Sequence, residues 1–117
     1  MRDFYMCKDW HSSGWWQRKR KHIKARYEWQ CCICGTVSKS VEVDHVIPYD
    51  NNHFTEDKKR EMFIAERNMW VLCPHCHRVK TSKFDGGLKS KDIKIGAASF
   101  YKNKIKKDLY NNLEVCS

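Results

Sequence analysis

Two pairs of cysteines, each with the spacing C-x2-C, constrain this chain more than any other feature of its sequence. The first pair is Cys31 and Cys34, and the second is Cys73 and Cys76. A C-x2-C turn brings two thiolates to one ion, and four such ligands make a closed tetrahedral zinc site. The glycine after Cys34 tolerates the positive φ that this tight turn requires. The sequence therefore predicts a structural zinc ion held by all four cysteines, the alternative being buried cysteines paired by chance.

A chain of 117 residues buries only a modest core, so a bound metal ion would add useful stability to the fold. Seven cysteines would also allow disulfides, but residues 1–5 are polar and mixed, so we expect no secretory leader, and no apolar run approaches transmembrane length. We therefore expect a soluble, cytoplasmic protein that uses paired cysteines for metal and has no membrane partner. Cys32 does not fit the ligand spacing and is expected to be a buried filler or a free thiol.

A strong positive charge indicates a polyanionic partner. The chain has 23 Lys and Arg against 14 Asp and Glu, a formal net charge of +9. Nucleic acid is favoured over a membrane surface, because no stretch joins its basic residues to a broad apolar face. Much of the charge lies in an expected helix from Ser13 to Trp29, where Trp16, Ile23 and Tyr27 face inward. Its candidate nucleic-acid-binding residues are Arg18, Lys19, Arg20, Lys21 and Lys24, the alternative being a solvated helix face.

The rest of the sequence alternates strands and helices. The expected elements are strand 41–47, helix 55–67, strand 68–72, a helix starting at 74 or 75 and stopped by Gly86-Gly87, and a basic tail in which 97–113 form a helix. Within strand 41–47, strict alternation puts His45 on one face and Asp44 on the other. The two side chains can meet at one site only if the strand ends, bends or bulges there, and Pro48 favours an early end.

Four groups of residues together resemble the HNH endonuclease family in its four-cysteine, zinc-bearing form. They are Cys31-x-x-Cys34-Gly35, Val43-Asp44-His45, Asn68 with Leu72-Cys73, and Cys76-His77-x-x-Lys80-Thr81. The resemblance covers about residues 4–84. It implies an α+β fold with a ββα-metal core, also called a His-Me finger, a four-cysteine zinc site and flanking helices. In size and layout the chain is also similar to small phage-encoded HNH proteins that accompany DNA packaging terminases.

The resemblance also implies roles for individual residues. The catalytic residues would be His45, Asn68 and His77, with His45 as the general base and Asn68 orienting the His45 ring. Asp44 and His77 would hold one catalytic divalent ion, for which Mg²⁺, Mn²⁺ and Ni²⁺ all suit a mixed carboxylate and imidazole site. Arg78 and Lys80 are further candidate phosphate contacts. A structure with His45 in the core and Asp44 in bulk solvent would contradict a nuclease.

The sequence thus predicts a metal-dependent DNA endonuclease in a single domain spanning 1–117. It comprises an N-terminal aromatic and basic helix (1–30), a zinc-stapled core (31–84) and a basic tail (85–117). DNA is the expected partner, together with phage terminase subunits, in a bacterial host whose phage or prophage encodes the chain. Two alternatives stay open: a zinc-ribbon module that binds DNA or the packaging machinery without a catalytic metal, and a restriction endonuclease for modified bases.

Overall fold

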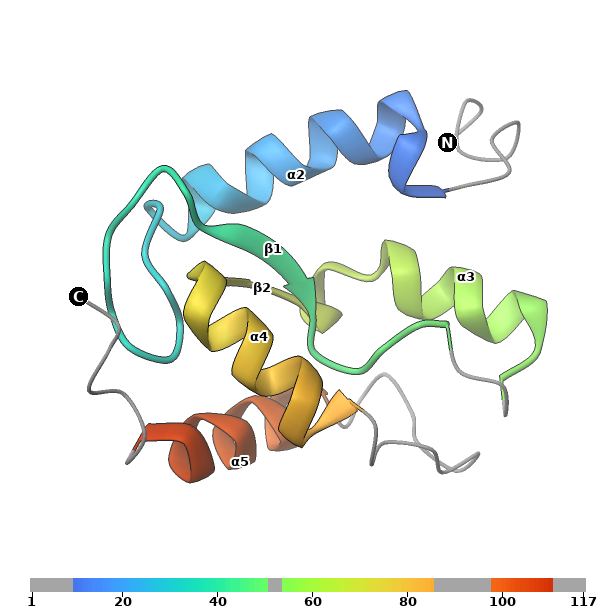
Figure 1. Ribbon diagram of the computed structural model, residues 1–117. Helices are drawn as coiled ribbons and strands as arrows, with labels where there is room; N and C mark the ends of the chain where they lie inside the picture. Colours follow the sequence, from blue (N-terminus) through green and yellow to red (C-terminus); the bar gives the residue numbers. More distant parts are fainter. Residues whose placement is uncertain (1–9, 51–53, 86–97, 111–117) are drawn as a thin grey trace.

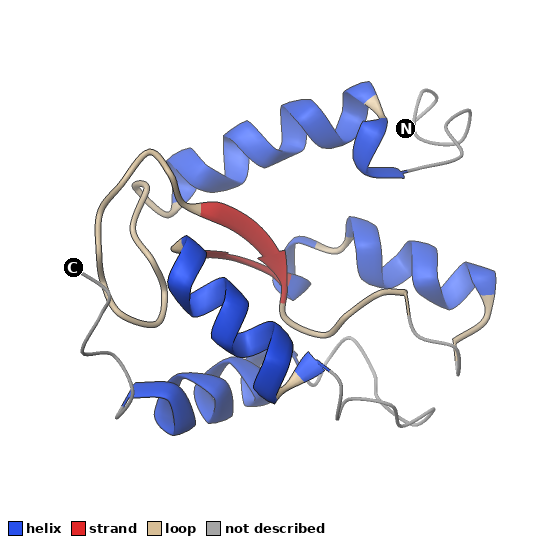
Figure 2. Ribbon diagram, viewed as in Figure 1, coloured by secondary structure: helices blue, strands red, loops and turns tan. Residues whose placement is uncertain are grey.

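The computed structural model describes residues 10–50, 54–85 and 98–110 (Figure 1). Its helices and strands, coloured by type in Figure 2, are η1 (Trp10–Ser12), α2 (Gly14–Arg26), β1 (Glu42–His45), α3 (Glu56–Ile64), η2 (Glu66–Asn68), β2 (Met69–Leu72), α4 (Pro74–Lys83) and α5 (Ala98–Tyr110). The predicted stop at Gly86-Gly87 lies outside the described residues. Among the helices in these ranges, none combines the length and apolar character needed to cross a bilayer.

The two strands form an antiparallel hairpin with helices on both sides. Asp44 lies opposite Trp70 in the pairing, and His45 lies opposite Met69. Because β2 is buried on both faces, it reads as a continuous apolar run. Met69 and Val71 pack toward α2, while Trp70 and Leu72 pack toward the cysteines and α5. Figure 1 shows α2 above the hairpin, with α4 and α5 below it. The mixed α+β core predicted from the sequence is confirmed.

Helix α2 starts where the sequence predicts and ends earlier. The Ser13 hydroxyl accepts a hydrogen bond from the Trp16 amide at 3.1 Å and so caps the helix. Trp16 and Ile23 are buried, as the predicted apolar stripe requires. The helix was expected to reach Trp29, but Glu28 and Trp29 have φ values of 57° and 59°. These left-handed residues stop the helix and turn the chain into the first cysteine pair.

The later elements follow the predicted order with shorter boundaries. Helix α3 is capped by Thr55, whose hydroxyl accepts from the Lys58 amide at 3.1 Å. Strand β1 stops at His45, two residues before the expected end, because the next two amides turn to Asn68. The Val46 amide donates to the Asn68 carbonyl at 2.8 Å, and the Ile47 amide donates to the Asn68 side chain at 2.9 Å. The early end of the strand directly follows the Asp44-His45 pair.

Candidate active site and metal-ligand cluster

The four cysteines of the two C-x2-C pairs converge on one point. Their sulfur atoms lie within 4.8 Å of one another, and the Cys34 and Cys73 sulfurs are 3.7 Å apart. Tetrahedral zinc with Zn–S bonds of about 2.3 Å places its ligands about 3.8 Å apart, so the cluster fits that ion. Gly35 has a φ of 81°, as predicted for the residue after the second cysteine. The cluster has the composition and spacing of a structural zinc site.

Backbone amides donate hydrogen bonds to two sulfur atoms of the cluster. The Cys34 amide donates to the Cys31 sulfur at 3.5 Å, and the Cys76 amide donates to the Cys73 sulfur at 3.4 Å. Burial raises the pKa of the Cys31 and Cys73 thiols. Burial also opposes ionisation of Cys34, but hydrogen bonds with Thr36 and its neighbours bring that pKa down to about 6. Cys32 lies outside the cluster, as its spacing predicts.

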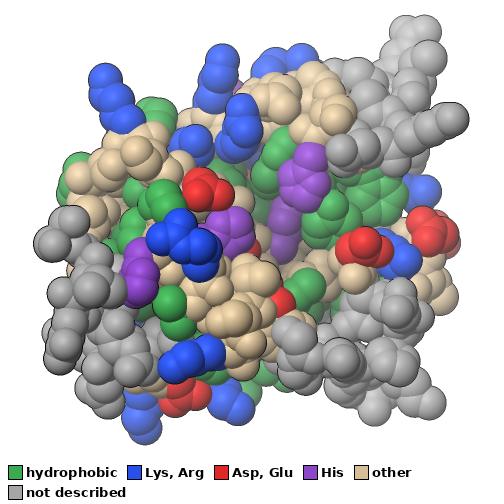
Figure 3. All heavy atoms as spheres, viewed as in Figure 1, with side chains coloured by type: hydrophobic (Ala, Val, Ile, Leu, Met, Phe, Trp, Pro, Cys, Tyr) green, Lys and Arg blue, Asp and Glu red, His purple; other side chains and the backbone are tan. Residues whose placement is uncertain are grey.

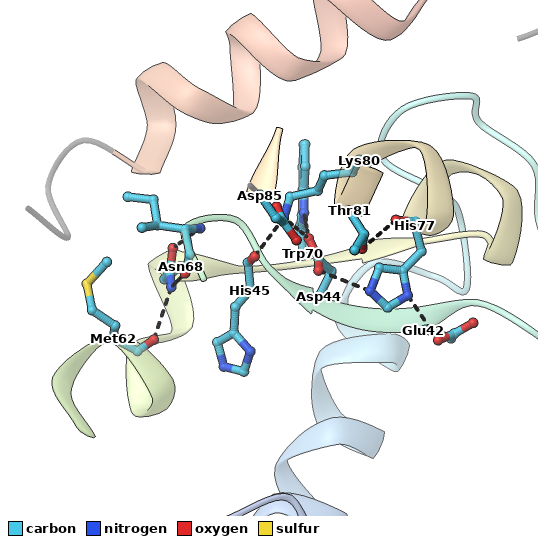
Figure 4. Close-up of polar contacts among 11 residues, drawn as sticks. Glu42, Asp44, His45, Met62, Asn68, Trp70, His77, Lys80, Thr81 and Asp85 are labelled. Atoms are coloured by element: carbon cyan, nitrogen blue, oxygen red, sulfur yellow. Dashed lines mark hydrogen bonds and ion pairs between the residues drawn. The ribbon is translucent and has the colours of Figure 1, made fainter. Parts of the chain in front are cut away.

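The Asp44 carboxylate is buried, and its Oδ2 atom contacts two side chains. Its Oδ2 accepts from the Trp70 indole at 2.9 Å and faces the Lys80 ammonium at 3.0 Å. Its Oδ1 points at the His77 Nε2 atom, 3.3 Å away (Figure 4). Burial opposes ionisation, but His77 and Lys80 outweigh it and lower the pKa of Asp44. Asp44 is therefore a carboxylate with Oδ1 as the atom directed toward His77.

His77 lies between two carboxylates. Its Nδ1 is 3.1 Å from the Glu42 carboxylate, and its Nε2 faces Asp44. Asp44 raises the pKa of His77 against the effect of burial, and Glu42 adds to the rise. Two ligand atoms 3.3 Å apart suit one divalent ion with bonds of about 2.1 Å. By holding Nδ1–H, Glu42 presents Nε2 as the coordinating atom, which is how neighbouring carboxylates orient metal-binding histidines.

Lys80 lies on α4 next to Asp44 and has no exposed surface. Its ammonium contacts Asp44 at 3.0 Å, Asp85 at 2.6 Å and the His45 carbonyl at 3.0 Å. An ammonium has three hydrogen-bond donors, and these three partners use them all. The expected phosphate contact by Lys80 is therefore not supported by its position. Lys80 instead ties the Asp44 carboxylate to the backbone of His45.

The His45 ring points away from Asp44, toward α2 (Figure 4). It is 7% exposed and packs against both Trp16 and Phe63, with ring centroids 5.3 Å and 5.1 Å away, and these two rings also contact each other. Its Nε2 lies 2.9 Å from the Phe63 carbonyl, which can only accept, so Nε2 carries the hydrogen and Nδ1 is left as the basic atom. Burial lowers the pKa of His45 to about 4. The ring is consequently neutral near pH 7.

Asn68 is buried beside the end of β1. Its side chain exchanges hydrogen bonds with the Ile47 backbone at 2.9 Å and donates to the Met62 carbonyl at 3.1 Å. These contacts fix the backbone after His45 to the end of α3. Asn68 therefore holds the backbone around His45, while the Phe63 carbonyl holds the ring itself. Its predicted catalytic role stays a prediction.

An arrangement with His45 in the core and Asp44 in bulk solvent would have contradicted a nuclease, and the structure does not have it. His45 is largely buried, but Asp44 is 6% exposed and faces His77. The Asp44-His45 pair therefore lies on two faces of the same strand end, one toward α4 and one toward α2. The sequence interpretation missed Glu42 and the contacts of Trp70 and Phe63. Alternation along β1 would have put Glu42 beside Asp44.

The candidate nucleic-acid-binding residues differ in their surroundings. Arg18 and Lys21 are exposed on α2, and Arg78 is exposed on α4. Lys19 is paired with Glu66. Arg20 and Lys24 are half-buried and border a groove beside His77. Figure 3 shows Lys and Arg side chains along α2 and His side chains gathered beneath them.

Comparison with known proteins shows the family of the chain. The model of the HNH endonuclease family matches residues 31–83. A curated protein of Lactococcus phage SK1, named "Probable HNH endonuclease", is 31% identical over 83 residues, which cover 64% of this chain and 83% of that protein. "Anaredoxin" of Nostoc sp. is 28% identical over 61 residues, covering 52% and 68%. No solved structure gives a significant match. The chain belongs to the HNH endonuclease family.

The buried state of His45 predicts a pH dependence of stability. Unfolded His45 takes up a proton below its ordinary pKa of 6.5, whereas the folded ring resists protonation down to about 4. The unfolded state thus binds more protons in this window, so stability falls as the pH drops. Between pH 7 and pH 5.5, we expect the wild type to lose about 1 kcal/mol more than His45→Gln in urea unfolding. Equal losses would show that the ring is not neutral and buried.

Proposed function

We propose that this protein is a metal-dependent DNA endonuclease that hydrolyses phosphodiester bonds with His45 as the general base. The observation that carries the proposal is the Asp44–His77 pair, whose ligand atoms face each other at 3.3 Å. A neutral histidine directly follows Asp44 in the chain. One strand end therefore supplies a candidate metal ligand and a candidate base, the two components that metal-assisted phosphodiester hydrolysis needs.

In the proposed reaction, His45 accepts the proton of the attacking water at Nδ1. The Phe63 carbonyl keeps the ring in the tautomer with Nδ1 unprotonated. Asp44 and His77 would hold the divalent ion, and Glu42 orients His77 for this. When bound, such an ion stabilises the charge of the pentavalent phosphorane and of the leaving 3′ oxygen.

Lys80 supports the same chemistry without touching substrate. Its charge favours the ionised form of Asp44, and its hydrogen bond to the His45 carbonyl fixes the strand end. Carboxylate and imidazole together do not select one metal, so Mg²⁺, Mn²⁺ and Ni²⁺ are all candidates. The four cysteines would hold zinc separately, because soft thiolates favour zinc over these harder ions.

The biological setting is also part of the proposal. The similarity to a protein of Lactococcus phage SK1 supports a phage or prophage origin and action in the host cytoplasm. A link to DNA packaging, with terminase subunits as partners, rests on the resemblance in size and layout to small phage HNH proteins. A DNA-binding or packaging module without catalysis is the competing function, and a modified-base restriction endonuclease would share the chemistry.

Cleavage of supercoiled plasmid tests the proposal. Protein freed of loosely bound metal is expected to nick or linearise the plasmid when Mg²⁺, Mn²⁺ or Ni²⁺ is added, and to leave it intact otherwise. His77→Ala should abolish this activity, because it removes one of two candidate ligands. His75→Ala, a half-buried neighbour two residues earlier on α4, is the matched control and should cleave normally.

Two outcomes would contradict the proposal. A protein that binds plasmid but leaves it intact with every metal would be a binding module. Cleavage that persists undiminished in His77→Ala would come from a contaminating nuclease. Zinc content should be measured before and after metal removal, so that loss of the cysteine-bound ion is not mistaken for loss of the catalytic one.

A further inference from the structure

A groove of about 240 Å³ lies between α2 and β1, next to the Asp44–His77 pair. Its walls come from two parts of the chain. Residues of η1 and α2 form one wall, and residues of β1 and α4 form the other: His11, Trp16, Arg20 and Lys24 face Glu42, Val43 and His77. The first wall lies outside residues 31–83, the segment that the family model matches. The sequence interpretation gave His11 no function.

Helical spacing explains why these residues of α2 meet in the groove. Trp16, Arg20 and Lys24 follow one another at intervals of four residues, so they lie on one face of the helix. Trp16 is buried against His45, and Arg20 and Lys24 are half-buried above β1. Helix α2 therefore contributes a buried aromatic residue and two partly buried cations to the groove.

The two cations are arranged unfavourably for an isolated protein. Like charges one helical turn apart repel each other. Burial lowers the pKa of Lys24, and the charge of Arg20 lowers it further, against a smaller opposing effect of Glu42. Elsewhere on α2, Lys19 and Arg26 are both paired with Glu66. Among residues 10–50, 54–85 and 98–110, no carboxylate forms an ion pair with Arg20 or Lys24. A polyanion in the groove would compensate for this.

We propose that this groove binds the sugar-phosphate backbone of the DNA strand being cut, with Arg20 and Lys24 contacting a phosphate next to the scissile one. The inference rests on the proposed function, because the scissile phosphate must lie at the Asp44–His77 end. The wall contributed by α2 then sets the path of the strand past the metal ligands.

His11 lines the same groove and contacts the rings of Trp16 and Phe63, which pack against His45. Its Nδ1 is 3.0 Å from the Tyr49 hydroxyl, and its ring meets the His45 ring edge-on with centroids 6.2 Å apart. Tyr49 thus fixes the orientation of the His11 ring. The short helix η1 therefore supplies a polar ring that both lines the groove and contacts His45.

DNA binding by charge-matched variants tests the inference. All variants carry His45→Ala, so that a labelled oligonucleotide duplex stays intact in Mg²⁺. Arg20→Gln with Lys24→Gln is expected to raise Kd about tenfold and to reduce the slope of log K against log salt by about 2, one for each lost phosphate contact. Lys104→Gln with Lys107→Gln removes the same charge from exposed positions on α5, across the molecule from α2 (Figure 1). This control should change Kd by less than about threefold.

A third variant separates the groove from the outer face of α2. Arg18→Gln with Lys21→Gln removes two exposed cations from the same helix. If it weakens binding as much as the groove variant, or if the α5 control does, the inference is wrong. Thermal unfolding checks that every variant is folded. Binding is measured without cleavage, so the two proposals can fail separately. If the wild type does not cleave plasmid but the groove variant binds DNA more weakly, the nuclease proposal is wrong and the groove proposal stands.

Discussion

Cys76→Ser is expected to abolish the folded state and to reduce the zinc content from one ion per chain to near zero. Serine is close to cysteine in size, so the change removes a ligand without leaving a large cavity. Structural zinc contributes about 10 kcal/mol or more in small zinc domains, which rivals the whole stability of a domain this size. The cysteine cluster also joins the turn before β1 to the start of α4. Loss of the ion therefore disconnects the two halves of the core.

Zinc analysis by mass spectrometry and thermal unfolding followed by circular dichroism will check this prediction. Cys32→Ser is the matched control, because Cys32 neighbours the ligands but lies outside the cluster. It should retain one zinc ion and a cooperative transition. A Cys76→Ser protein that unfolds at the wild-type midpoint would show that the cluster has no structural metal.

His45→Ala is expected to lower kcat for plasmid cleavage by about a thousandfold, the loss typical of a missing general base. DNA binding should change little, because His45 does not line the groove. Alanine leaves a gap beside Trp16 and Phe63, which pack against the His45 ring. His45→Gln fills more of that space and should be equally inactive, so a fold defect can be told apart from a lost base.

His22→Ala serves as the histidine control for this experiment. His22 is exposed on α2, outside the groove. It should cleave at the wild-type rate. If His45→Gln is folded and its kcat stays within about tenfold of the wild type, a residue other than His45 accepts the proton.

The cysteine ligands and the order of elements were predictable because their signals are local. Cys31 and Cys34 lie in one turn. Cys73 and Cys76 lie at the start of α4, on either side of Pro74, the first residue of that helix. Caps, proline and cysteine spacing act over a few residues. The ends of α2 and β1 were less predictable. Helix α2 ends because Glu28 takes a positive φ in the following turn, and β1 ends because the Asn68 side chain, distant in sequence, binds the Ile47 amide.

The surroundings of the site could not be predicted in the same way. Lys80 looks like a surface cation in the sequence, yet it is buried and pairs with Asp44, which lies far earlier in the chain, in β1. His11 lies far from His77 along the chain, and the packing of α2 brings both to one groove. Such contacts are set by tertiary structure, and a single sequence carries no local signal for them.

The opposite orientation of Asp44 and His45 makes the proposed site depend on how β1 and β2 pair. Shifting β1 by one residue against β2 would exchange the two faces, turning His45 toward α4 and Asp44 toward the aromatic rings beside α2. The Trp70 indole bonds to Asp44, its partner across the hairpin, only in the observed alignment. This bond favours the observed pairing at the very residue that the proposed metal site needs, so one side-chain pair both aligns the strands and positions a candidate ligand.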